Sequence, residues 1–168
     1  MIAVTVMHHN MLAHINIGSN IGDSRSAIER AVAAVFALSE GETRRSSLVE
    51  SEPWGFESPN MFLNVGVEIE TSLPPEELLR RLQDVERGIC ADSHRNPDGS
   101  YRDRQIDIDL IFMARRNDTL DGWETVVYDS PHLTLPHPRA SERHFVVAPI
   151  MELHRSLARP ESLFLKRR

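Results

Sequence analysis

The chain has 168 residues, of which 40% are hydrophobic and 26% charged, values typical of one globular domain with a full core. A net charge of −6 argues against a protein that binds nucleic acid through bulk positive charge, and no apolar run approaches the length of a membrane span. The single cysteine, Cys90, excludes an intramolecular disulfide and favours a reducing, cytoplasmic location.

The two ends of the chain differ in character from the segment between them. Residues 1–11 lack a basic region before their apolar residues and a clear cleavage site, which argues against a signal peptide. We expect a leader or disordered N-terminus over residues 1–11, one domain over residues 12–160, and a solvated basic tail over residues 161–168.

The first half of the chain alternates between strand and helix patterns. Residues 12–17 predict a strand, and the turn residues after it lead into a helix from Asp23 or Ser24 through about Leu38. A second strand is predicted over residues 43–51. After a loop with two prolines, residues 61–70 show the clearest strand pattern, with Phe62 and Asn64 on the less apolar face.

The second half begins with a helix at Pro74 and Pro75, where acidic residues complement the positive end of the helix dipole. A polar loop over residues 91–102 leads into a strand over residues 104–112. A short edge strand is predicted over residues 125–128, and prolines keep residues 133–138 extended. A third helix begins at Ser141 and must distort or end near Pro149.

The predicted order is therefore β-α-β-β-α-β with short additions at the end. Two helices and four main strands at this length indicate an α+β fold. We expect a ferredoxin-like two-layer sandwich, in which the helices pack against an antiparallel sheet.

The strand over residues 104–112 carries two acids on one face. Apolar Ile108, Leu110 and Phe112 alternate with Asp107 and Asp109, so the two carboxylates point the same way, roughly 6.5 Å apart along the strand. Like charges at this spacing repel, and a hard divalent cation such as Mg²⁺ would compensate them and couple them to phosphates. The alternative is a solvated strand face with two ordinary acids.

Several cations lie near this strand in the sequence, namely Arg102, Arg104, His137 and Arg143. The planar fork of an arginine suits phosphate, because it forms bidentate, charge-assisted hydrogen bonds. Each arginine taken singly is equally well explained as a solvated surface charge, and the group as a salt-bridge network.

The pair Phe62 and Asn64 resembles a recognition site for a flat heterocycle, since one side chain stacks and the other binds an edge. A second small core beneath a helix or loop is the alternative for Phe62, and also for Phe145. Trp54 and Phe56 lie in a proline- and glycine-rich loop, either as part of a lid or as anchors of that loop. Neither G-x-x-x-x-G-K-[ST] nor G-x-G-x-x-G occurs, so no glycine-rich cradle for phosphates is present.

Taken in order, these motifs resemble those of the 6-hydroxymethyl-7,8-dihydropterin pyrophosphokinase family of folate biosynthesis. The resemblance spans about residues 12–153. The motifs are Ile17-Gly-Ser-Asn20 with Gly22-Asp23, Glu52-Pro53-Trp54-Gly55, Phe62-Leu-Asn64, Arg104-Gln-Ile-Asp107-Ile-Asp109, Leu135-Pro-His137-Pro and Glu142-Arg143-His-Phe145.

This resemblance implies a ferredoxin-like fold and a transfer of the terminal diphosphate of ATP to the hydroxymethyl group of the pterin, releasing AMP. It implies roles for individual residues as well. Asp107 and Asp109 would bind two Mg²⁺ ions, and Arg104, His137 and Arg143 would complete the catalytic set and hold phosphates.

By the same resemblance the remaining site residues divide between the two substrates. The pterin would contact Ser51, Glu52, Pro53, Trp54, Phe62, Asn64 and Phe145, with its ring between the two phenylalanines. ATP would contact Gln83 and Glu86 as well as the phosphate-binding residues.

This chain departs from the family pattern in the loop before the acid strand. Gly88 is followed by Ile89-Cys90-Ala91, where many members have Gly-Arg-x-Arg, so Arg95 or Arg102 is expected to replace an arginine there. The loops over residues 91–103 and 52–60 are candidates for lids.

Two rival functions remain open at this point. One is another Asp-x-Asp phosphotransferase or nucleotidyl transferase, and the other is a ferredoxin-like binding or regulatory module. We expect an enzyme that acts as a monomer on small molecules, with no nucleic-acid or membrane partner.

Overall fold

The computed structural model describes residues 10–90, 96–117, 122–157 and 159–165. Its centre is an antiparallel sheet in which β1 (Met11–Ser19) lies between β4 (Phe62–Thr71) and β5 (Asp107–Arg116). The strand order is β2-β4-β1-β5-β6, and β3 also pairs with β4. This strand order is consistent with the expected ferredoxin-like arrangement, as is the order along the chain, in which one long helix follows β1 and another follows β4.

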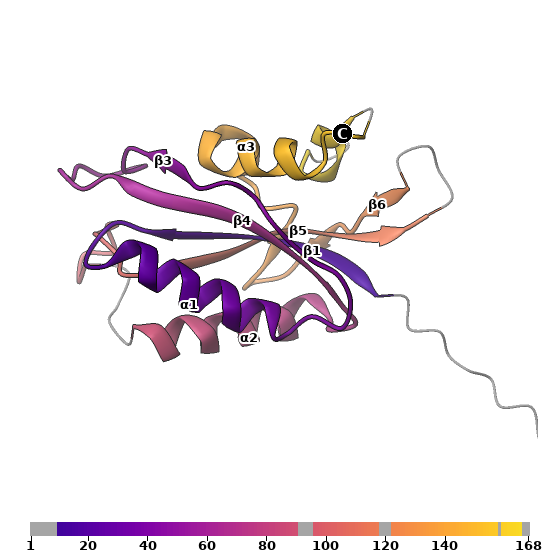
Figure 1. Cartoon of the computed structure of the whole chain (residues 1–168), viewed down its shortest axis with the longest axis horizontal. Helices are drawn as coiled ribbons and strands as arrows, with labels where there is room; N and C mark the ends of the chain where they lie inside the picture. Colours follow the sequence, from indigo (N-terminus) through magenta and orange to yellow (C-terminus); the bar gives the residue numbers. More distant parts are fainter. Residues whose placement is uncertain (1–9, 91–95, 118–121, 158, 166–168) are drawn as a thin grey trace, which may run out of the picture.

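Two long helices cover one face of the sheet (Figure 1). In α1 (Ser24–Phe36) the carboxylate of Asp23 caps the first turn by accepting from the backbone N–H of Ser26. In α2 (Pro75–Ile89) Pro75 occupies the first turn, where its missing N–H costs nothing. The apolar stripes of both helices bury the main core against the inward side chains of β1, β4 and β5.

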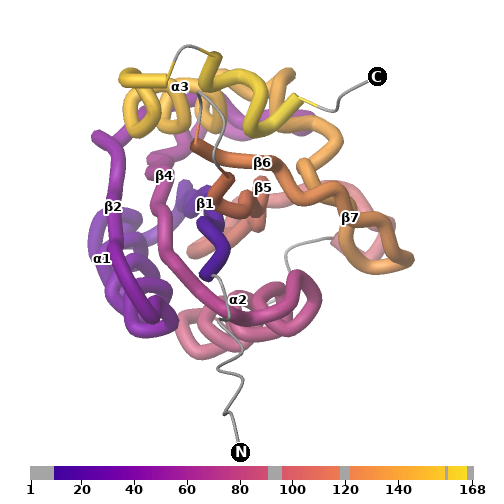
Figure 2. The backbone as a smooth tube through the Cα atoms, turned by 90° about the vertical axis from the view of Figure 1, so that its right-hand side faces the viewer, coloured from indigo at the N-terminus to yellow at the C-terminus, as the bar shows by residue number. Residues whose placement is uncertain are grey.

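The opposite face carries a partial third layer in addition to the expected sandwich (Figures 1 and 2). This layer is α3 (His144–Leu153), preceded by a 3₁₀ turn (Ala140–Glu142) and followed by another (Pro160–Leu163). A second, smaller core forms beneath it and includes Phe112, Val146 and Ile150. Part of this face of the sheet is therefore covered by α3 and shielded from water, and the remainder is available for a site.

A bulge in the pairing of β1 with β5 changes which face the later residues of β5 occupy. His14 pairs with Phe112 and Ile15 with Leu110, so Ile111 is an extra residue. As a consequence Phe112 packs beneath α3, whereas Ile108 and Leu110 pack against the other helices. Strict alternation over residues 104–112 placed Phe112 on the same face as Ile108 and is wrong for that reason.

The predicted second strand is interrupted. The structure has β2 (Thr43–Arg45) and β3 (Val49–Ser51), both paired with β4. Four steps along this edge, from Arg45 to Val49, face three steps along β4, and Ser46 fills the gap by bonding both backbone groups of Gly66.

Near the other edge of the sheet the expected strand at 125–128 is divided between two strands. One is β6 (Trp123–Thr125), and the other is β7 (Tyr128–Asp129), which pairs with β8 (Thr134–Leu135).

The C-terminal segments also differ from expectation. The third helix begins at His144 rather than Ser141, and it continues through Pro149, which is buried against Gly66. Leu163 and Phe164 are buried in the second core, so the described part of the expected tail belongs to the fold. At the other end, Met11 already belongs to β1, and residues 1–9 lie outside the described residues.

Candidate active site

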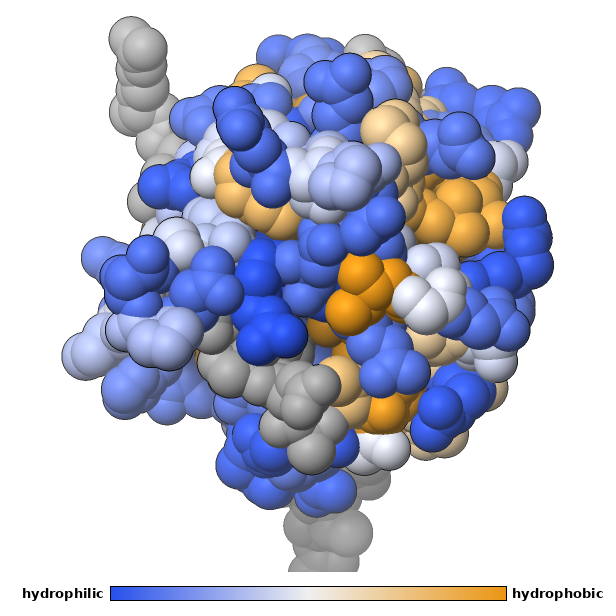
Figure 3. Space-filling view, turned by 90° about the vertical axis from the view of Figure 1, so that its left-hand side faces the viewer, coloured by the Kyte–Doolittle hydropathy of each residue, from blue (hydrophilic) through white to orange (hydrophobic). Residues whose placement is uncertain are grey.

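A cavity of about 320 Å³ opens where β1 ends and β4 and β5 begin. Figure 3 views the molecule from this end and shows a mostly hydrophilic face with a few apolar side chains near its centre. The residues that line the cavity come from four strands, three connecting segments and the start of α3. They are Asn16, Ser51, Glu52, Trp54, Phe56, Phe62, Asn64, Tyr101, Arg104, Asp107, Asp109, His137, Arg143 and Phe145.

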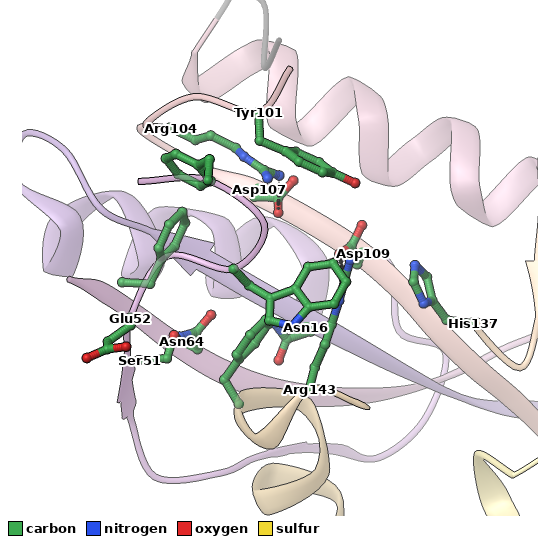
Figure 4. Close-up of a pocket in the computed structure, with 14 residues that line it drawn as sticks. Asn16, Ser51, Glu52, Asn64, Tyr101, Arg104, Asp107, Asp109, His137 and Arg143 are labelled. Carbon is green, nitrogen blue, oxygen red and sulfur yellow. Dashed lines mark hydrogen bonds and ion pairs between the residues drawn. The ribbon is translucent and has the colours of Figure 1, made fainter. Parts of the chain in front are cut away.

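Strand register explains why the polar residues meet there. Gly18 of β1 lies between Asn64 of β4 and Asp107 of β5. Two residues earlier in β1, Asn16 lies opposite Asp109. Because side chains two apart in a strand share a face, these rows form one polar surface beside the second core (Figure 4).

Each acid of the pair has an arginine partner. Arg104 forms an ion pair with Asp107, and Nη1 of Arg143 lies 3.3 Å from Oδ2 of Asp109. Both arginines also keep a buried Nε with no hydrogen-bond partner among the described residues. The arginines therefore neutralise the acids and retain donor capacity for a ligand.

A third carboxyl lies behind the acid pair. Glu86 of α2 accepts a hydrogen bond from the backbone N–H of Ile108, at 3.0 Å. Burial, together with the negative charge of Asp107, raises the pKa of Glu86 to about 8. Glu86 is therefore mostly protonated at neutral pH, and the negative charges in this part of the site are those of Asp107 and Asp109.

His137 meets the acids from the segment after β8. Burial and the charge of Arg143 and Arg139 lower the pKa of His137 to about 4, so the imidazole is neutral at physiological pH. Its Nδ1 accepts from the backbone N–H of Arg139 at 3.2 Å, which places the remaining ring hydrogen on Nε2. The His137 ring is therefore neutral, with its hydrogen on Nε2.

The amide of Asn64 is fixed by its neighbours. Its Nδ2 donates to Ser51 Oγ at 3.0 Å and to the backbone carbonyl of Val49 at 3.2 Å. A Cβ on Gly18 would come within 2.9 Å of Asn64 Oδ1, so glycine keeps space open in front of this oxygen.

Aromatic side chains form the apolar walls. Phe62 is buried and meets Phe56 edge to face, with ring centroids 6.2 Å apart. The guanidinium of Arg143 lies 4.5 Å from the centre of the Trp54 ring and 6.0 Å from the centre of the Phe145 ring. The loop after Ser51 therefore contacts the site through its aromatic residues.

The remaining residues expected at the site are less closely placed. Gln83 and Arg102 are exposed, and neither they nor Pro53 line the cavity. Arg95 lies outside the described residues.

Sequence reasoning missed Asn16 and Tyr101, which line the cavity. A signal for Asn16 was available, since His14 and Asn16 are polar residues two apart in an otherwise apolar strand. Tyr101 gave no such signal, because it lies in a polar loop and contacts Arg104 only in the folded chain, at 5.1 Å.

A second cavity of about 330 Å³ adjoins the first and shares Asp109 and His137 with it. Residues of β5 and of the segment 130–138 line it. Asp109 and His137 thus lie between two spaces, each large enough for part of a small molecule, whereas Asp107 lines only the first.

The acids do not form a complete metal site by themselves. Among the described residues, no three His, Cys, Asp or Glu side chains gather as ligands for a metal ion. A Mg²⁺ ion bound there would take its remaining ligands from water and from substrate oxygens. Of the helices that the structure describes, none is long and apolar enough to span a membrane.

Comparisons with known proteins agree with this arrangement. A relative from Bacillus subtilis, named 2-amino-4-hydroxy-6-hydroxymethyldihydropteridine pyrophosphokinase, is 36% identical over 145 residues, covering 86% of this chain and 78% of its own. Relatives of the same name from Porphyromonas gingivalis and Aquifex aeolicus are 34% and 31% identical. They cover 84% and 88% of this chain, and 90% and 82% of their own lengths.

The fold has a counterpart among solved structures. A crystal structure of HPPK-DHPS in complex with substrates superposes with a TM-score of 0.59 at 12% identity, covering 88% of this chain and 40% of the other. The sequence model of the 7,8-dihydro-6-hydroxymethylpterin-pyrophosphokinase family matches residues 14–155. The chain therefore belongs to the 7,8-dihydro-6-hydroxymethylpterin-pyrophosphokinase family.

Proposed function

We propose that the protein transfers a diphosphate from ATP to the hydroxymethyl group of 6-hydroxymethyl-7,8-dihydropterin, giving the pterin diphosphate and AMP. This is a step of folate biosynthesis. The observation that carries the proposal is the acid pair at the junction of two adjoining cavities. Asp107 and Asp109 both line the first cavity, Asp109 also lines the second, and each acid has its own arginine.

The two substrates would occupy different cavities. The pterin would lie in the first, with its ring between Phe62 and Phe145 and its edge at Asn64 and the backbone of residues 51–54. The nucleotide would lie in the second cavity, with its phosphates directed at His137 and the acids. ATP would contact Gln83 and Glu86 of α2. It would also contact Arg102 and Arg95, which lie between α2 and β5 in the sequence.

The donor set fits magnesium. Asp107 and Asp109 provide hard carboxylate oxygens on one strand face, and we propose that together they hold two Mg²⁺ ions. When bound, Mg²⁺ would neutralise the triphosphate and the charge that develops on it during transfer.

The side chains would act by exchanging partners. Arg104 and Arg143 neutralise the acids in the structure, and each keeps a buried Nε without a partner among the residues described. With Mg²⁺ held by the acids, Arg104 and Arg143 would be free to form bidentate contacts with phosphate oxygens. Nε2 of His137 donates a further hydrogen bond to phosphate.

The reaction itself needs positioning more than acid–base chemistry. The hydroxymethyl oxygen attacks the β-phosphorus in line with the departing AMP oxygen. A bond from the hydroxymethyl oxygen to the β-phosphorus replaces the bond from AMP, the hydroxyl proton is released to the medium, and charge accumulates on the phosphoryl oxygens during transfer. Stacking fixes the pterin, and the arginines and His137 stabilise that charge. The reacting groups are buried where the two substrates meet, which excludes water.

We also propose that the protein works as a cytoplasmic monomer, with one catalytic domain over residues 12–160. Support comes from the fit of the family match to most of that range and from the single cysteine.

One assay tests the proposed activity. The protein is mixed with ATP, Mg²⁺ and 6-hydroxymethyl-7,8-dihydropterin, and the nucleotides are separated by chromatography. We expect AMP to form in a manner that depends on the pterin. Formation of ADP, or no nucleotide turnover above background, would overturn the proposal.

A further inference from the structure

The amide of Asn16 is a buried polar group without a partner. Asn16 is 4% exposed, lines the first cavity, and its Oδ1 has no hydrogen bond among the described residues. Buried polar atoms are nearly always paired, because leaving one unpaired forfeits its hydration. An unpaired amide that lines a substrate cavity therefore indicates a partner that arrives with the ligand.

The neighbour of Asn16 on the strand, His14, has a partner for one of its two ring nitrogens. Its Nδ1 is 2.9 Å from Glu68 Oε1, and its Nε2 is buried without a partner among the described residues, but His14 does not line the cavity. Asn16 faces Gly66 on one side and Asp109 on the other. Gly66 has no side chain to offer a hydrogen bond, and a carboxylate accepts hydrogen bonds but donates none, so neither neighbour can donate to Oδ1.

The unpaired atoms around the cavity differ in kind. Arg104 Nε and Arg143 Nε are donors, which match phosphate oxygens, whereas Asn16 Oδ1 is an acceptor. An ionised triphosphate offers acceptors only, and the ribose and adenine donors would lie at the far end of the nucleotide. The donor that suits Asn16 therefore belongs to the other substrate.

The place of Asn16 identifies which part of that substrate it meets. Asn64 of β4, which would bind the ring edge, and Asp109 of β5, which would bind metal, lie on either side of β1. Asn16 of β1 is directly opposite Asp109 and diagonally across from Asn64, which pairs with Gly18 (Figure 4). A pterin that spans this interval has its hydroxymethyl arm directed toward the acids.

We propose that Asn16 binds the hydroxymethyl group of the pterin and orients it for attack. Oδ1 accepts the hydrogen bond of the hydroxyl, which leaves an oxygen lone pair directed at the β-phosphorus. This inference rests on the proposed diphosphate transfer and adds a substrate contact that sets specificity for the hydroxyl.

The test compares two ligands on two proteins. Binding of 6-hydroxymethyl-7,8-dihydropterin and of 6-methyl-7,8-dihydropterin, which lacks the hydroxyl, is measured by fluorescence titration with Mg²⁺ and a non-hydrolysable ATP analogue present. We expect the wild-type protein to prefer the hydroxymethyl ligand by about tenfold, the value of one hydrogen bond. Asn16→Ala should lose that preference while its affinity for the methyl ligand stays unchanged.

Controls separate the contact from effects on folding. Asn117→Ala makes the same chemical change outside the cavity and should retain the preference. Asn16→Leu keeps the volume and removes the amide, so it should behave as Asn16→Ala does. Thermal unfolding of both Asn16 variants should match the wild type, because no hydrogen bond within the described protein is lost.

Two results would overturn the inference. One is a hydroxyl preference retained by both Asn16 variants, and the other is an equal loss of affinity for both ligands, as expected if Asn16 holds a water molecule or shapes the ring pocket. If wild-type protein forms no AMP, the proposed function itself fails. If wild type forms AMP and either of these two results is obtained, only the role of Asn16 fails.

Discussion

Two carboxylates and two arginines form a closed set of ion pairs at the edge of the cavity. Asp107 pairs with Arg104, and Asp109 with Arg143, so the charges that ATP and metal would meet are already balanced within the protein. The electrostatic repulsion between two adjacent acids on one strand is thereby offset, since each negative charge has a cation beside it. It also means that ligand binding exchanges partners rather than creating charge pairs anew.

At the scale of single residues, Asp107 and Asp109 should be indispensable for catalysis but not for folding. We expect Asp107→Ala and Asp109→Ala each to lower turnover by about a thousandfold or more, since the metal loses a ligand and the phosphates lose their neutralisation. Production of AMP measures turnover, and circular dichroism checks the fold. Asp84→Ala, which removes an exposed acid from α2, is the matched control and should leave turnover unchanged. Near wild-type turnover in either site variant would exclude the metal role.

Phe62 should distinguish the two substrates. Phe62→Ala removes a ring that lines the first cavity, so pterin binding should weaken by about tenfold or more while ATP binding is nearly unchanged. Separate titrations of the two ligands measure this, with Phe62→Leu as a variant that keeps apolar volume. Equal losses for both ligands would show that Phe62 only fills the core near Phe56.

At the scale of elements, α3 is held to the sheet by a buried polar cluster. Glu68 of β4 accepts from His14 at 2.9 Å and from His154 at 2.5 Å through Oε1, while Arg44 meets Oε2 at 2.6 Å. Arg44 also donates to the carbonyl of Leu153 at the end of α3, at 3.2 Å. The C-terminal end of α3 is thus anchored, and its N-terminal end carries Phe145 into the site.

This cluster makes stability depend on pH in acid. Burial alone would raise the pKa of Glu68, but hydrogen bonds from His14 and His154 outweigh it and lower the pKa to about 2. A carboxyl with a depressed folded-state pKa stabilises the protein above its unfolded value of 4.5, by about 3 kcal/mol here, and that contribution is lost as pH falls from 4.5 toward 2.

Urea unfolding as a function of pH checks this expectation. Over that acid range the free energy of unfolding of the wild type should fall more steeply than that of Glu68→Gln. The variant should also be less stable than the wild type at neutral pH. Glu70→Gln, on the same strand, is the control and should follow the wild type. Parallel curves for the wild type and Glu68→Gln would contradict the assignment.

Local pattern predicted most elements and failed where pairing between strands decided the outcome. The helix from Pro75 to Ile89 followed from its apolar stripe and its first-turn prolines and acids. The bulge that moves Phe112 to the other face depends on how β5 pairs with β1, which no window of sequence contains. The helix through Pro149 depends on Gly66, a residue more than eighty positions away, leaving room for the proline ring.

At the scale of the whole molecule, the site lies where the exposed part of one sheet face meets the start of α3. Motif residues such as Asp107, Asn64 and Arg143 were predictable because their types carry the chemistry. Asn16 had a signal in the sequence, as a polar residue in an otherwise apolar strand, but its unpaired amide in the cavity is known only from the structure. The pairing of arginines with the acids was likewise open to more than one interpretation until their distances were known.

The central claim is that two phosphates move together from ATP to the pterin. The most direct measurement uses ATP labelled separately in the β- and γ-phosphates, with the pterin product isolated after a single turnover. Both labels should appear on the pterin in equal amounts, with unlabelled AMP released. Transfer of the γ label alone, or of neither label, would contradict the account.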